Sequence, residues 1–181
     1  MSKNGLILLK PTSIAYTGTS ASISANGSVS FSACSVLSLN GVFSADYDNY
    51  TVVLGYGGSA STSLRGRWRA SGTDEDSASN YYTYQVLSAT STTVSGSRST
   101  TNTTLFSAHG SSLWNGSVVY VYGPYLTQPT AHRNVNVRST DGARIYDYAG
   151  THSQSLAYDG FTIYPDSGNI TGLVSVYGMR K

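Results

Sequence analysis

The most informative stretch of this sequence reads GFTIYPDSGNITGLVSVYG and runs from Gly160 to Gly178. It holds two runs of strand-forming residues, 161–164 and 170–177, separated by the turn-forming residues PDSGN. Proline presets φ for a turn, Asp and Ser hydrogen-bond to nearby backbone, and Gly adopts positive φ. In the second run apolar residues fall on one face, as in a half-buried strand. The stretch predicts a β-hairpin that closes an all-β domain, and it contains no catalytic group.

Charged residues are scarce throughout the 181-residue chain. They make up 11% of it, against roughly 25% in ordinary soluble domains. The 11 Lys and Arg nearly balance the 9 Asp and Glu, so the net charge of +2 predicts no nucleic-acid partner. Instead, 31 Ser and 20 Thr fill the polar positions, beside 15 Tyr and 19 Gly. This composition favours contact with other protein copies or neutral sugars. The alternative is a soluble β-sandwich that is poor in Lys and Glu.

Turn signals recur roughly every 8–12 residues, and no stretch shows helical periodicity over the length that a helix needs. Two further hairpins are predicted, one over residues 20–32 around a primed Asn26-Gly27 turn and one around residues 139–142. The Ser/Thr-rich stretch 90–104 forms either weak strands or a surface loop. Other strands are predicted at residues 36–43, 50–56, 63–70, 81–89, 105–106, 113–114, 118–122, 135–138 and 143–148. About ten strands indicate a single antiparallel β-sandwich domain, jelly-roll-like in its connections.

The apolar run Leu6, Ile7, Leu8 and Leu9 precedes Lys10-Pro11. It is too short for a signal peptide or a membrane span, so we expect a protein made and kept in a cytosol or released from one by lysis. The run is either an ordinary first strand or an arm that adds to the sheet edge of a neighbouring subunit. Residues 1–15 are therefore assigned to an N-terminal arm or first strand, and residues 16–181 to the β-sandwich.

Three arginines alternate along one predicted strand, which places Arg65, Arg67 and Arg69 on the same face. They have two interpretations. The guanidinium groups could contact an anionic glycan or a lipopolysaccharide phosphate, or they could pair with acidic residues such as 74–76 on a neighbouring strand or subunit. The sequence favours the second, structural interpretation.

The aromatic cluster Tyr81, Tyr82 and Tyr84 has the same two interpretations. Tyrosine rings stack on sugars, but tyrosine ladders also stabilise sheets and interfaces. We treat the cluster as a candidate for either a ligand or a neighbouring subunit.

No catalytic or metal-binding pattern is present in the sequence. His109, His132 and His152 lie in turn-like, polar surroundings without the spacing of a zinc site. The members of a Ser/His/Asp triad need not be close in sequence, but no particular serine stands out. Residues 74–76 lack the glycine pattern of an EF-hand loop and are predicted to be a solvated loop. Cys34, the single cysteine, predicts a small buried side chain rather than a disulfide. We expect no catalytic residue, no metal and no cofactor.

Three segments together resemble a family of small virion proteins from tailed bacteriophages, of the minor tail, tail-fibre-like or head-decoration kind. They are NGLILLKPTS, SLNGVFSADYDNYTVVL and GFTIYPDSGNITGLVSVYGMRK. The residues that carry the resemblance are Val42-Phe43-Ser44, Tyr47-Asp48-Asn49-Tyr50, Thr171-Gly172 and Val176-Tyr177-Gly178. Met179 stands where the family usually has another aromatic residue.

The resemblance implies a non-enzymatic structural protein on the exterior of the virion, made in the bacterial host cytoplasm. It implies a homo-oligomer, with a trimer as the commonest arrangement, in contact with other tail or capsid proteins and without membrane insertion. A tail or fibre component is the first interpretation, and a capsid decoration protein is the second. A domain that binds a host surface glycan and an enzyme such as a glycan esterase are further alternatives.

Overall fold

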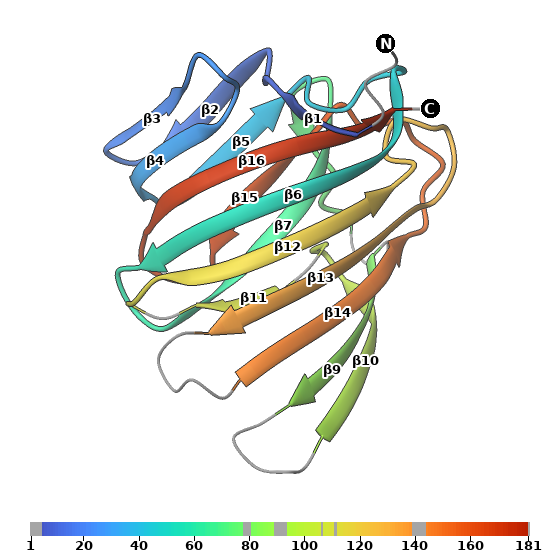
Figure 1. Ribbon diagram of the computed structural model, residues 1–181. Helices are drawn as coiled ribbons and strands as arrows, with labels where there is room; N and C mark the ends of the chain where they lie inside the picture. Colours follow the sequence, from blue (N-terminus) through green and yellow to red (C-terminus); the bar gives the residue numbers. More distant parts are fainter. Residues whose placement is uncertain are drawn as a thin grey trace.

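The computed structural model describes residues 5–77, 81–88, 94–105, 107–110, 112–138 and 144–180, and these form two antiparallel β-sheets without a helix (Figure 1). The large sheet contains β1 (Leu6–Leu9), β3 (Ser20–Ile23), β4 (Val29–Cys34), β6 (Tyr47–Gly58), β9 (Tyr81–Ser88), β10 (Val94–Asn102), β12 (Asn115–Tyr122), β13 (Thr130–Arg138), β14 (Arg144–His152) and β16 (Ile170–Arg180). The small sheet contains β2 (Ser13–Thr17), β5 (Val36–Asn40), β7 (Thr62–Ala70), β8 (Thr73–Asp74), β11 (Ser107–Gly110) and β15 (Gly160–Pro165). The predicted all-β antiparallel architecture is confirmed.

The large sheet has the order β10-β9-β14-β13-β12-β6-β16-β4-β3, and β1 also pairs with β16. One side of β16 therefore pairs with β6 along nearly its whole length, and the other side pairs first with β4 and then with β1. The small sheet has the order β11-β7-β15-β5-β2, with β8 on β7. In Figure 1 the large sheet lies in front of the small sheet. The last strand of the chain thus lies inside the large sheet rather than at its edge.

The predicted closing hairpin is wrong, although both of its strands form. Phe161 of β15 pairs with Leu39 of β5 and Trp68 of β7 in the small sheet. Leu173 of β16 pairs with Ser30 and Gly55 in the large sheet. The alternation of side chains shows which face of a strand is buried, but it does not identify the neighbouring strand. The two strands face each other across the interior, and the turn between them joins the two sheets.

The turn between β15 and β16 is held by the connection between β6 and β7. The backbone N–H of Asn169 donates to the Ser59 hydroxyl oxygen at 3.0 Å, and the N–H of Ser59 donates to the Asn169 carbonyl at 2.8 Å. The N–H of Asp166 donates to the Ser63 carbonyl at 2.9 Å. Gly168 has a φ of +71°, which suits glycine. The β6–β7 and β15–β16 connections, which both cross between the sheets, therefore stabilise each other by hydrogen bonds.

The two other predicted hairpins form, as β3–β4 and β13–β14. The first has a different turn from the one expected. Ser24 N–H donates to the Ser28 carbonyl at 2.8 Å, and Gly27, with a φ of +105°, is the one turn residue with positive φ. A primed two-residue turn needs positive φ at both central positions, so this is a longer, three-residue loop. The predicted turn at 139–142 lies outside the described residues.

The remaining strand predictions are mostly confirmed, with two exceptions. Residues 113–114 and Leu105 lie outside any strand, Phe106 lies outside the described residues, and β2, β8 and β11 were not predicted. The sequence left two predictions for residues 90–104, weak strands or a surface loop. This stretch contains β10.

An apolar core fills the space between β4, β6 and β16 on one side and β5, β7 and β15 on the other. Phe43 lies at its centre, with its ring 5.9 Å from those of both Trp68 and Phe161. Cys34 is buried there as predicted, and burial raises the pKa of its thiol. Tyr50 packs its ring 4.7 Å from Phe43, and its hydroxyl donates to the Ser44 carbonyl at 2.9 Å. The residues of the VFS and YDNY segments thus serve the core and the turn beside it.

Candidate interaction surface

Strand β13 has polar side chains inside, whereas the neighbouring strand β14 buries the rings of Tyr146 and Tyr148. His132, Asn134 and Asn136 of β13 are buried, although they are polar. Val137 of β13 and Ile145 of β14, which pair directly with each other, are 51% and 52% exposed. A strand with one face on a core normally has the opposite arrangement. The usual in–out pattern is therefore inverted in β13.

The polar side chains inside are joined by hydrogen bonds. The Ser117 hydroxyl donates to the Asn134 side-chain oxygen at 2.5 Å. The Asn136 amide donates to a backbone carbonyl of β12 at 2.9 Å, and the Asn115 amide donates to the Tyr56 carbonyl at 3.2 Å. Buried polar groups are tolerated when they are paired in this way. The inward polar side chains are therefore partly paired, although the amide nitrogen of Asn134 has no hydrogen-bond partner among the described residues.

Two of the three histidines lie in this polar interior, so their prediction as turn residues is wrong. His152 accepts or donates a hydrogen bond of 2.9 Å between Nδ1 and the Tyr158 hydroxyl. The His132 ring lies edge-on to Trp68, with centroids 6.4 Å apart. Burial lowers the pKa of His132 to about 3 and that of His152 to about 4. Both imidazoles are therefore neutral in the folded protein at neutral pH.

The outer side of the large sheet carries exposed apolar side chains on several strands. One row runs across five strands in direct register: Leu173, Gly55, Gly116, Val137 and Ile145. Directly paired side chains on one face of a sheet lie within contact distance. We call this surface the exposed face and define it by its six large, exposed apolar residues: Val53, Tyr120, Tyr122, Val137, Ile145 and Leu173.

The exposed face carries few charges. Arg133, which pairs across the strand with Tyr120, lies among its side chains. Its guanidinium forms a two-pronged ion pair with Asp147, with contacts of 2.5 and 3.1 Å. This carboxylate raises the pKa of Arg133 above its ordinary value. Because the charges neutralise each other, the surface has the neutral, aromatic character that protein interfaces favour.

The predicted arginine stripe lies on the outer side of the small sheet, where its members are engaged within the chain. Arg69 forms an ion pair with Asp74, which is one of the acidic partners considered in the sequence. It also donates to the hydroxyls of Thr162 at 2.9 Å and Ser38 at 3.2 Å, and to the Asn40 side chain at 3.0 Å. Its side chain is nearly buried as a result.

The other two members of the stripe, Arg65 and Arg67, are also engaged within the chain. Arg65 binds Asp166 with two contacts of 2.8 Å, and this carboxylate raises the pKa of Arg65. Arg67 lies over the Tyr164 ring at 5.1 Å and donates to the Thr103 carbonyl at 3.2 Å. The stripe therefore stabilises the outer side of the small sheet, and its donors are directed at groups of the same chain.

The other sequence candidates have different outcomes. Tyr81, Tyr82 and Tyr84 belong to β9, which lies between β14 and β10, but their side chains are outside the described part of the structure. Leu6, Ile7, Leu8 and Leu9 form β1, which pairs with β16 of the same chain. The first-strand interpretation of this run describes the observed pairing.

The exposed face was not predicted as a site from the sequence. The available signal was the segment HRNVNVR in β13, whose alternation is clear but does not show which side faces inward. Within the described residues, no three His, Cys, Asp or Glu side chains converge as ligands of one metal ion. The described part of the chain also has no helix that could cross a membrane. Comparison of the chain with protein family models, curated protein sequences and solved structures finds no match.

Proposed function

We propose that this protein is a non-enzymatic structural protein on the exterior of a bacteriophage virion, and that it assembles as a homotrimer through the exposed face. The inverted pattern of β13 carries the proposal. Val137 of β13 and its partner Ile145 of β14 are about half exposed, although large apolar side chains of a sheet normally face the core. Their outward position is favourable when a second copy covers them, because each buried apolar side chain then contributes about 1.5–3 kcal/mol.

The size of the exposed face fits a stable interface. Six strands from β14 to β4, about 4.8 Å apart, and about seven residues along each give a surface on the order of 700 Å². Stable interfaces bury about 800 Å² on each partner. The exposed face therefore offers nearly the area that a lasting contact between two copies needs.

The outer side of the small sheet is a weaker candidate for the same role. Arg65, Arg67 and Arg69 already bind groups of their own chain. A partner would have to replace these contacts, and separating the nearly buried Arg69 from Asp74 is costly. The contrast favours assembly through the large sheet.

Two other observations support the proposal. The resemblance of the opening, central and closing segments to small phage virion proteins indicates the particle exterior as the location. The chain also crosses repeatedly between the sheets, for example at β4–β5, β5–β6, β6–β7, β14–β15 and β15–β16. Repeated crossing is a property of jelly-roll sandwiches, so we propose that the fold is of this kind.

Light scattering after size-exclusion chromatography tests the assembly. We expect the wild-type protein to be a trimer, and the double variant Val137→Lys/Ile145→Lys to be a folded monomer by circular dichroism. Arg65→Gln, on the small sheet, is the matched control and should remain trimeric. A wild-type monomer, or a double variant that stays trimeric, would contradict the proposal.

Mass spectrometry of purified particles tests the location, and immunogold microscopy separates the alternatives. Label on the tail or its fibres supports a tail component, whereas label on the head supports a capsid decoration protein. Absence of the protein from particles would remove both interpretations.

A further inference from the structure

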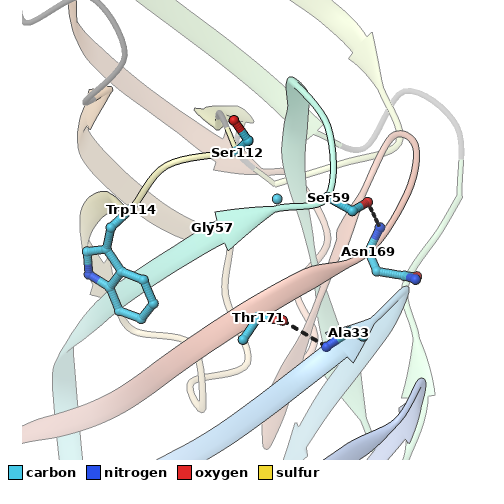
Figure 2. Close-up of a pocket in the computed structure, with 8 residues that line it drawn as sticks. Ala33, Gly57, Ser59, Ser112, Trp114, Asn169 and Thr171 are labelled. Atoms are coloured by element: carbon cyan, nitrogen blue, oxygen red, sulfur yellow. Dashed lines mark hydrogen bonds between the residues drawn. The ribbon is translucent and has the colours of Figure 1, made fainter.

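A cleft of about 290 Å³ opens at the end of β6, beside the exposed face (Figure 2). Gly57 lies in the middle of its lining, between residues Ser112 and Trp114 on one side and Thr171 of β16 on the other. The volume is at the lower end of the range for ligand pockets, about 300–1,000 Å³. The cleft can therefore hold a small ring-shaped ligand in contact with protein on several sides.

Trp114 supplies a large aromatic surface at this cleft. Its side chain is 60% exposed, although it lies against β6. A Cβ atom at Gly55 would come within 2.9 Å of the indole Cζ2 and 3.0 Å of Nε1. The absence of a side chain at Gly55 thus leaves room for the indole to rest on the strand. The ring is positioned by backbone contact while much of its surface stays open to solvent.

Neutral polar groups surround the rest of the cleft. Thr171 Oγ1 accepts a hydrogen bond of 2.9 Å from the Ala33 N–H, and Ser59 Oγ accepts one of 3.0 Å from the Asn169 N–H (Figure 2). A hydroxyl that accepts from a backbone amide is fixed in position and still has its own proton to donate. Among the described residues, the Asn169 side-chain amide has no hydrogen-bond partner. None of the lining residues is charged.

We propose that this cleft binds a neutral saccharide, with one face of a sugar ring against Trp114 and its hydroxyls bonded to Asn169 and the fixed hydroxyls. An apolar ring contact together with a few neutral donors and acceptors matches the two-sided chemistry of a pyranose. A phosphate or carboxylate ligand would find no cation in the lining, and an apolar ligand would leave the amide unpaired. The site differs from the arginine and tyrosine candidates of the sequence, and it goes beyond the proposed structural role.

The fluorescence of the two tryptophans of the chain gives a direct readout of ligand binding at the cleft. Trp68 is 1% exposed, so acrylamide in solution quenches the fluorescence of Trp114 selectively. Galactose, glucose, N-acetylglucosamine and maltose are the neutral probes, and glucose 6-phosphate and glucuronic acid are the charged comparators. Because Trp114 rests on Gly55 in the exposed face, quenching is measured in both the wild-type protein and the Val137→Lys/Ile145→Lys variant, and we expect at least one neutral probe to protect Trp114 in the variant, whose exposed face is free.

Two variants and one control locate the binding. Isothermal titration calorimetry of the protective sugar should show that Trp114→Ala weakens affinity about tenfold or more. Gly57→Val should do the same by filling the cleft, because a Cβ there meets no atom closer than 3.4 Å and the fold can accept it. Leu113→Ala, a neighbouring exposed position outside the lining, should stay within about twofold.

Protection by charged comparators only, or by no probe up to its solubility, would overturn the proposal. So would Trp114→Ala binding as tightly as the wild type. These outcomes leave the oligomer measurement untouched, so the saccharide site and the proposed structural role stand or fall separately.

Discussion

The interior of this protein has two ends of different chemistry. Where β6 and β16 face the small sheet, it holds apolar side chains such as Phe161 and Val174. Beneath β13 it holds Asn134, Asn136 and His132, all buried. We call these parts the apolar end and the polar end. The apolar end stabilises the monomer by burial, whereas the polar end combines hydrogen bonds with the buried rings of Tyr146 and Tyr148 and leaves Val137 outside. The comparison suggests that folding and assembly use different parts of one sheet.

The largest effect is expected at the apolar end. Phe161→Ala should lower the free energy of unfolding by about 3–5 kcal/mol, because it removes a ring that packs against Phe43 and leaves a cavity. Guanidinium denaturation followed by tryptophan fluorescence measures the loss. Leu113→Ala, an exposed position, serves as the control. A loss below about 1 kcal/mol would mean that the apolar end does not dominate stability.

The second-largest effect on stability is expected from acid, which should destabilise the polar end. The folded-state pKa values of His132 and His152, about 3 and about 4, lie below their ordinary value of 6.5. The unfolded chain therefore binds more protons below pH 6.5, and stability falls as the pH drops from there toward the folded pKa values. We expect a loss on the order of 2–4 kcal/mol between about pH 6.5 and pH 5.

Urea denaturation at a series of pH values measures this slope. His132→Gln and His152→Gln should each remove about half of it, since each imidazole contributes up to one proton. A slope that is unchanged in both variants would show that other groups cause the acid sensitivity.

A smaller effect is expected from the hydrogen bond between Ser117 and Asn134. Asn134→Leu should cost about 1–2 kcal/mol, because it leaves the buried Ser117 hydroxyl without its acceptor. The double variant Asn134→Leu/Ser117→Ala should recover most of the loss in a denaturation cycle. If the double variant is as unstable as the sum of the single variants, the two side chains act independently.

The smallest effect on the monomer is expected at the exposed face. Val137→Thr should change the unfolding free energy by less than about 0.5 kcal/mol, because its side chain is half exposed. The same variant should raise the dissociation constant of the oligomer about five- to tenfold, which analytical ultracentrifugation measures. An equal effect on both quantities would remove the proposed division between folding and assembly.

The local elements could be predicted from the sequence where one side of a strand is apolar. In β6, Val52 and Leu54 point inward and Val53 outward, as their alternation predicts. The neighbours of each strand could not be predicted in the same way, because β15 and β16 are adjacent in sequence but belong to different sheets. Strand pairing depends on residues far apart in the chain, and local patterns contain no information on it.

The candidate sites were harder to predict than the strands. The alternation in β13 was visible, but hydrophobicity assigns Val137 to the core and Asn136 to solvent, which is the reverse of the structure. The cleft at Trp114 escaped prediction because its lining comes from four separate segments. The arginine stripe, in contrast, was found correctly as one face, since three residues at alternate positions define it without any distant contact.

The position of β16 has a consequence for how this protein is made. Among the described strands, β1 pairs only with β16, and β6 and β4 each have β16 as one of two neighbours. A nascent chain that lacks β16 therefore has unpaired strand edges. The large sheet can close only after synthesis has passed residue 170. Folding of the large sheet should therefore wait for β16, and nascent chains that stall before this strand should be the ones that aggregate or engage chaperones.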